Sequence, residues 1–97
     1  MKKFIILPGA KADLRTTARF YEAQTPRLGK AFLADFDEVI TRVVEFPLAN
    51  PVLYKAARKA RLHNFKFNVY YLLDAGRVVV FAVLHWRRHP DSWKKRI

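Results

Sequence analysis

Residues 65–84 read FKFNVYYLLDAGRVVVFAVL, and this stretch decides the fold because two strand patterns flank a turn signal. In its first half, apolar side chains occupy every second position, at Phe65, Phe67, Val69, Tyr71 and Leu73. Such alternation is typical of a β-strand with one buried face. The turn falls at residues 74–77, where Gly76 is able to take a positive φ angle. Residues 78–84 then return as a wholly apolar run, which predicts an antiparallel partner strand near the centre of the sheet.

Two further strands complete the predicted sheet. Residues Arg58–His63 form a shorter pattern with mostly charged side chains, and we interpret them as a third antiparallel strand. Near the start of the chain, Lys3–Leu7 is a short apolar stretch that Pro8 and Gly9 interrupt. We interpret this stretch as the first strand, with the proline and glycine as a break after it.

Two amphipathic helices are predicted between the first strand and the rest of the sheet. In Lys11–Ala23, apolar side chains recur at helical spacing at Leu14, Ala18 and Tyr21. Thr25 and Pro26 then offer a start for the second helix, and Pro47 ends it. The apolar stripe of this helix consists of Leu28, Phe32, Phe36, Val39, Val43 and Phe46.

The predicted order is therefore β-α-α-β-β-β, which belongs to the α+β class. We expect an antiparallel sheet of about four strands with the N-terminal helical hairpin packed on one face. Residues 1–97 are expected to form one domain, because a chain of 97 residues buries only one modest core. The other face and one edge of the sheet remain free for a functional surface.

Charge is concentrated in the second half of the chain. The net charge is +11, and residues 51–97 contain eleven basic and two acidic residues, a balance of +9. Such a field favours a polyanionic partner, which includes nucleic acid, an acidic protein segment and an anionic membrane surface. There are no cysteines, so disulfides and thiolate metal sites are excluded.

The start of the chain imitates a secretion signal only superficially. The apolar run at residues 4–7 is far shorter than the roughly 7 to 15 residues of a signal core. Nor does any stretch approach the roughly 18 consecutive apolar residues that a membrane span requires. We therefore expect a soluble, cytoplasmic protein without a membrane partner.

Several short motifs follow one another in a particular order. They are Ala12-Asp13-Leu14, Tyr21, Leu28-Gly29 with Phe32, Phe46-Pro47, Arg61-Leu62 with Phe65, Val69-Tyr70-Tyr71, residues 78–83, and the ending His85-x-x-Arg88-x-Pro90-x-x-Trp93. In this order and spacing they resemble the ParE/RelE superfamily of bacterial toxins, and the ParE-like branch most closely. The resemblance spans nearly the whole chain.

The resemblance implies the toxin of a type II toxin-antitoxin system, of the kind associated with plasmid stabilisation. Such a toxin arrests growth when it is free and is silenced in a hetero-oligomer with its cognate antitoxin. Family antitoxins carry a DNA-binding domain and a segment that folds along the toxin, so contact with DNA is expected to be indirect. An acidic segment of this kind suits the +9 half of the chain.

The resemblance leaves two targets open. ParE-like members block DNA gyrase by binding it, whereas RelE-like members cleave mRNA in the ribosomal A site. Catalysis of the second kind requires an acid, a base and cations around the phosphate. Arg61, His85 and Arg88 are the candidates for these roles. However, Asn68 stands about where the family places an arginine, and Trp93 stands where it places a tyrosine, so we favour gyrase.

A binding surface is the simpler function for this mixture of residues. We expect the target or the antitoxin to contact a set that combines arginines with aromatic side chains, because both types are common in interface hot spots. The set consists of Arg58, Arg61, Tyr70, Arg87, Arg88 and Trp93. A basic module that binds nucleic acid without being toxic is a further alternative.

Structural explanations compete with these functional ones. His85 is expected to share a face with Val79, Phe81 and Val83, and to be satisfied by a backbone carbonyl. Trp93 is equally well explained as a side chain that folds back onto the helices. Residues 94–96 are most simply a solvated terminus. No cofactor is expected, because the glycines at positions 9, 29 and 76 form no phosphate-binding loop and the histidines show no metal-ligand spacing.

Overall fold

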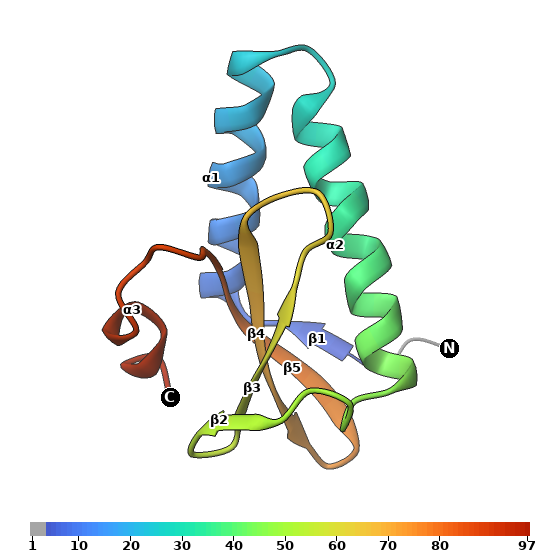
Figure 1. Ribbon diagram of the computed structural model, residues 1–97, viewed down its shortest axis with the longest axis vertical. Coiled ribbons are helices and arrows are strands. Elements are labelled where there is room, and N and C mark those ends of the chain that lie inside the picture. Colours follow the sequence, from blue (N-terminus) through green and yellow to red (C-terminus); the bar gives the residue numbers. More distant parts are fainter. Residues whose placement is uncertain (1–3) are drawn as a thin grey trace.

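The computed structural model describes residues 4–97 (Figure 1). The elements, in chain order, are β1 (Phe4–Ile6), α1 (Pro8–Gln24), α2 (Leu28–Glu45), β2 (Val52–Tyr54), β3 (Ala57–Arg61), β4 (Phe67–Asp74), β5 (Arg77–His85) and α3 (Asp91–Lys94). The expected α+β class is confirmed, and so is the order of the six predicted elements. The structure has β2 and α3 in addition. No helix in the described part of the chain is both long and apolar enough to cross a membrane.

The five strands form one mixed sheet in the order β1-β5-β4-β3-β2. The β4–β5 hairpin is antiparallel as predicted, and its turn has positive φ at Ala75 (51°) and Gly76 (77°). Two expectations about the sheet were wrong. β1 pairs with β5 in parallel, because the intervening helices carry the chain back across the sheet, and β2 adds a fifth strand of only three residues. So short a strand leaves no alternation in the sequence.

The helix boundaries differ from the predicted ones for two local reasons. α1 begins at Pro8 itself, because proline fits the first turn of a helix and the expected break after it does not exist. Lys3, predicted as the start of the first strand, lies outside the described residues. α2 begins at Leu28 and not at Thr25–Pro26. Its first turn is capped by Glu22, whose carboxylate accepts hydrogen bonds from the amides of Arg27 (2.9 Å) and Gly29 (3.1 Å).

The two helices cover one face of the sheet, which we call the helix face. Aromatic rings meet there at close range, with Phe32 5.4 Å from Phe65 and 5.3 Å from Phe67 between ring centroids. A buried carboxylate ties this layer to the β3–β4 connection. Asp35 accepts hydrogen bonds from the amides of His63 (3.0 Å) and Asn64 (2.7 Å). The helix layer is therefore fixed both by apolar packing and by a satisfied charge.

A β-bulge in β5 changes which side chains share a face. Tyr70 pairs with Ala82 and Tyr71 with Val80, so Phe81 is an extra residue in its strand. Val83 consequently lies on the helix face with Val80, whereas Phe81 and Ala82 both belong to a second apolar cluster on the opposite, open face. The expectation that His85 shares a face with Val79 and Phe81 was wrong, because a simple two-residue period does not continue through a bulge.

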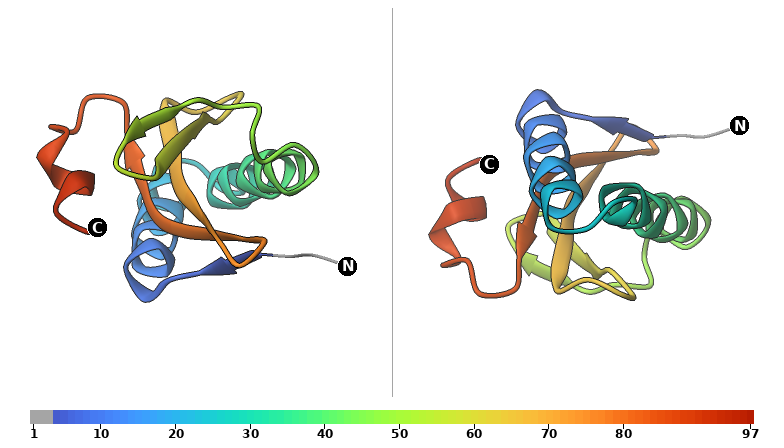
Figure 2. Two further views of the ribbon diagram at one scale, coloured as in Figure 1. Left: turned by 90° about the horizontal axis from the view of Figure 1, so that it is seen from below. Right: turned by 90° about the horizontal axis from the view of Figure 1, so that it is seen from above.

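The C-terminal segment packs on the open face. Figure 2 places α3 and α2 on opposite sides of the sheet. Trp93 is only 6% exposed and belongs to the open-face cluster, so the expectation that it folds onto the helices was wrong. Arg96 forms a bidentate ion pair with Asp13 (2.7 and 3.2 Å) and also donates to the carbonyl of Phe81 (3.1 Å). The chain end is anchored and is not the solvated terminus that was predicted.

Candidate binding surface on the open face of the sheet

Side chains from β3 and β4 alternate on the open face. The antiparallel register pairs Lys59 with Tyr70 and Arg61 with Asn68. Directly paired residues in an antiparallel sheet point to the same face. Two cations therefore stand beside an aromatic hydroxyl and an amide, on the side of the sheet that the helices leave uncovered.

Arg61 and Trp86 form an exposed stacked pair. The guanidinium carbon of Arg61 lies 3.9 Å from the centroid of the Trp86 ring, and Trp86 is 41% exposed. The backbone of Trp86 is held in place because its amide donates to the carbonyl of Lys66 (2.9 Å). A cation over an aromatic face is attracted by the ring quadrupole, so each side chain restrains the other. The pair is ordered before any partner arrives.

Tyr70 and Trp93 form a second stacked pair, which is buried. Their ring centroids are 4.8 Å apart and the rings are nearly parallel, at 18°. Burial raises the pKa of the Tyr70 hydroxyl above its usual value of 10.0, and a hydrogen bond from the Asn68 amide (3.2 Å) partly opposes this rise. Tyr70 was predicted as an exposed contact residue, but Trp93 covers it.

A hollow of about 290 Å³ lies between the two stacked pairs. We call it the open-face hollow, and define it by the residues that line it: Leu53, Lys59, Asn68, Tyr70, Trp86, Arg88, Pro90, Trp93 and Lys94. Three of its residues are cationic, and none is acidic. The hollow therefore combines aromatic surface, a buried amide and positive charge.

The segment after β5 presents two exposed arginines. The amide of Arg87 donates to Nδ1 of His85 (3.0 Å), and the side chain of Arg88 donates weakly to Ser92 (3.4 Å). Arg88 lines both the open-face hollow and a larger hollow of about 600 Å³ beside α1. His85 was expected to be satisfied by a backbone carbonyl, but its Nδ1 accepts from a backbone amide instead.

The three candidate ribonuclease residues do not meet at one point. His85 lines the hollow beside α1, and its ring lies 5.3 Å from that of Phe67 on the helix face. Arg61 stacks on Trp86, the first residue after β5, whose side chain lines the open-face hollow on the other side of the sheet. Arg88 lines one hollow together with His85 and another together with Trp86. The arrangement separates an acid–base candidate from the cation expected to act with it.

Arg58 differs from the other predicted contact residues because it has a structural partner. Its guanidinium donates to the backbone carbonyl of Asn50, and the side chain is half-buried. Asn50 in turn donates to the hydroxyl of Tyr71 (3.2 Å), which itself donates to the carbonyl of Pro47 (3.0 Å). Arg58 therefore helps to hold the loop between α2 and β2.

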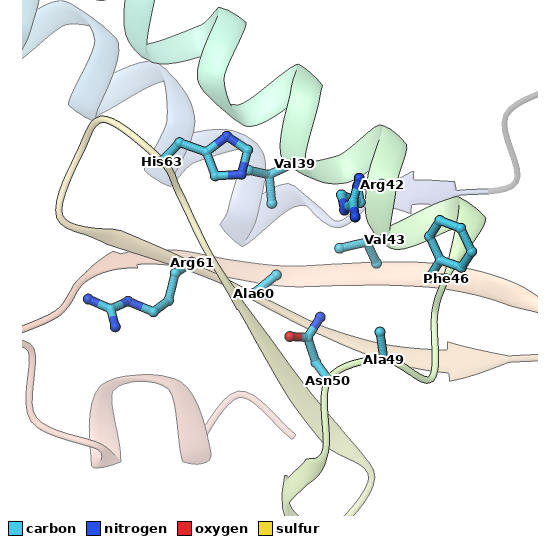
Figure 3. A pocket seen from close by; sticks show the side chains of 9 residues that line it. All are labelled: Val39, Arg42, Val43, Phe46, Ala49, Asn50, Ala60, Arg61 and His63. Carbon is cyan, nitrogen blue, oxygen red and sulfur yellow. The ribbon is translucent and has the colours of Figure 1, made fainter.

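A second cationic groove, of about 330 Å³, runs between α2 and β3. Figure 3 shows Val39 and Val43 on α2 and Ala60 on β3 facing one another, with Arg42 and His63 beside them, whereas the guanidinium of Arg61 points away from α2. Arg42 and His63 were not among the predicted contact residues, because only the packing of α2 against β3 brings them together. Trp86 was also missed as a contact residue, although its position beside His85 and Arg87 was a possible signal. No group of three or more potential metal ligands occurs among residues 4–97.

Comparisons with known proteins agree with this architecture. A family model described as the ParE toxin of the type II toxin-antitoxin system parDE matches residues 4–90. Among solved structures, the chain is similar to "Chromosomal ParDE TA system from P. aeruginosa", with a TM-score of 0.63 and 13% sequence identity. That alignment covers 88% of this chain and 96% of the other, and at such low identity it shows a shared fold. The comparison with curated proteins gives no match.

Proposed function

The chain belongs to the ParE toxin family of type II toxin-antitoxin systems, and from this premise we propose that it arrests growth by binding and inhibiting DNA gyrase. A toxin of such a system has an antitoxin as its partner. The contact with gyrase is made by the exposed Arg61–Trp86 pair together with Arg87 and Arg88. Inhibition takes place in the cytoplasm, where gyrase acts on DNA.

The observation that carries this proposal is the ordered, exposed stack of Arg61 on Trp86 (3.9 Å). Tryptophan and arginine are the residue types most enriched in interface hot spots. A pair that is already ordered loses little side-chain entropy when a partner binds. Arg87 and Arg88 surround it with positive charge, which accelerates association with a negatively charged partner surface.

The arrangement of titratable groups supports binding and not catalysis. Neither an indole nor a guanidinium exchanges protons at neutral pH. His85, the candidate for proton transfer, lies on the helix-face side of the sheet, against Phe67. A ribonuclease mechanism would require His85 to act beside Arg61, and the strand places them on opposite sides.

The groove in Figure 3 suits the antitoxin. It is apolar at Val39, Val43 and Ala60, and Arg42 places a positive charge beside it. An acidic, amphipathic antitoxin segment would bury its apolar side there and pair a carboxylate with Arg42. The toxin reaches DNA only through the antitoxin.

An inhibition assay with purified components tests the gyrase proposal. We expect Trp86→Ala to raise the concentration needed for half-inhibition of supercoiling by about tenfold or more, as for the loss of a hot-spot residue. Phe46→Ala is the matched control, because Phe46 is also exposed (54%) and also lies beneath an arginine, Arg42, at 5.8 Å. This control should inhibit gyrase like the parent toxin. Equal inhibition by both variants would remove the Arg61–Trp86 pair from the proposal.

A parallel measurement of cellular mRNA separates the two targets. Expression of the free toxin should halt growth while transcripts stay intact. Cleavage of translated mRNA at the A site, with gyrase unaffected, would instead establish the ribonuclease alternative.

A further inference from the structure

Asn68 is the most unusual polar residue on the open face. It is only 5% exposed, and its Oδ1 has no hydrogen-bond partner within the described part of the chain. Its Nδ2 donates to the Tyr70 hydroxyl (3.2 Å). Rotating the amide by 180° would let the hydroxyl donate to the oxygen, but would leave the nitrogen unpaired. In either orientation one buried polar atom lacks a partner, which is rare in folded proteins.

The hollow that Asn68 lines is cationic. Lys59, Arg88 and Lys94 contribute positive charge to it, and no carboxylate is among its lining residues. The nearest acid along the chain, Asp91, lies beside His89 at 3.6 Å. A ligand with a negative charge is therefore favoured, and nothing in the hollow neutralises the three cations in advance.

Aromatic surface forms the rest of the walls. Trp86 is fixed by Arg61, and Trp93 is fixed by its stack on Tyr70. The hydroxyl of Tyr70 is protonated at neutral pH, as any tyrosine with a pKa of 10.0 or above is, so it is able to donate a hydrogen bond. At about 290 Å³ the hollow is at the lower end of small-ligand sites, too small for a helix.

We propose that the open-face hollow binds a single nucleotide, whose base edge pairs with the unpartnered amide of Asn68 and whose phosphate is held by Lys59, Lys94 and Arg88. A nucleotide supplies three features that the hollow lacks, namely a planar ring for the exposed indole of Trp86, a donor or acceptor for the amide, and a negative charge. An acidic peptide would satisfy the cations but leave the exposed ring of Trp86 without a flat partner. The nucleotide is either free or part of a single strand.

Binding of nucleotides to the isolated toxin tests this proposal. We would titrate the purified protein with 5′-mononucleotides of each base, the matching nucleosides, inorganic phosphate, a short acidic peptide and short single-stranded oligonucleotides. The readouts are tryptophan fluorescence and the side-chain amide resonance of Asn68. We expect saturable nucleotide binding that shifts this resonance, with nucleosides and phosphate weaker by about tenfold or more, because each lacks one class of contact.

Variants locate the site and keep the test independent of folding. Lys59→Ala and Asn68→Ala should each weaken nucleotide binding, and Asn68→Ala should also alter the preference among bases. Lys30→Ala is the control, since Lys30 is exposed on α2 and lines none of the hollows described above. Tighter binding of oligonucleotides than of mononucleotides would identify the ligand as a strand, and equal binding would identify it as a free nucleotide.

Three outcomes would overturn the proposal. These are nucleotide binding that inorganic phosphate or the acidic peptide matches, binding that does not saturate, and binding that Lys30→Ala weakens as much as Lys59→Ala. None of them bears on gyrase inhibition, which is measured separately and does not require this ligand. Failure of the nucleotide site and failure of the proposed function are therefore distinguishable.

Discussion

Replacing Trp93 by alanine should destabilise the protein strongly, although Trp93 lies four residues from the end of the chain. Its side chain is 6% exposed, stacks on Tyr70 at 4.8 Å, and contacts the ring of Tyr54 at 6.2 Å. Truncating a buried tryptophan to alanine typically lowers the free energy of unfolding by about 3–5 kcal/mol. We expect about 3 kcal/mol, at the low end, because α3 is a single short helix and solvent reaches its outer side. For a domain of this size that corresponds to a fall in Tm of roughly 12 °C or more.

Urea unfolding followed by far-UV circular dichroism measures this change, and Trp86 provides a matched control. Trp86 is 41% exposed, so Trp86→Ala should change the free energy of unfolding by less than about 1 kcal/mol. If Trp93→Ala is no more destabilising than Trp86→Ala, the open-face cluster does not contribute to the core. The assignment of Trp93 as a packing residue would then be wrong, and a contact role would replace it.

Four other substitutions test separate parts of the fold. Asp35→Ala should lower the free energy of unfolding by about 2–4 kcal/mol in urea denaturation, because two backbone amides lose their buried acceptor; an effect below 1 kcal/mol would contradict this. Gly29→Ala should destabilise by about 1–3 kcal/mol, since a Cβ there would lie 2.5 Å from the carbonyl oxygen of Ala18. Gly9→Ala meets nothing closer than 3.4 Å and should be neutral or stabilising, so equal effects at the two glycines would refute the close helix contact. The raised pKa of Tyr70 means that the folded state favours the protonated hydroxyl, so this contribution to stability is present below pH 10 and is lost as pH rises through the folded pKa. Tyr70→Phe should remove that part of the alkaline loss, and an unchanged profile of stability against pH would exclude Tyr70 as its source.

The β4–β5 hairpin was predictable because alternation, a turn signal and a return strand all agree there, although β4 begins at Phe67 and not at the predicted Phe65. The bulge at Phe81 was not, because an extra residue is visible only when the partner strand supplies the register. For the same reason the face of His85 was assigned wrongly. β2 was missed because three residues carry no periodicity, and the parallel pairing of β1 depends on how the helical hairpin crosses the sheet.

The candidate surface was predicted only in part. Arg61 and Arg88 were identified as cations among strand and C-terminal motifs, and the structure places both at the open face or its rim. The stack of Arg61 on Trp86 joins β3 to the end of β5 across β4, so no local pattern contains it. Tyr70 and Trp93 are residue types that are common in interfaces, but each is buried against the other. Residue type alone does not distinguish an exposed aromatic side chain, free to bind another molecule, from one that is buried within the fold.

Gyrase supercoiling in the presence of the purified toxin, with and without its antitoxin, tests the central claim most directly. We predict that supercoiling falls as the toxin concentration rises, and that a stoichiometric amount of antitoxin restores it. Supercoiling that stays unchanged at saturating toxin, under conditions where the same preparation arrests growth, would contradict the claim that gyrase is the target.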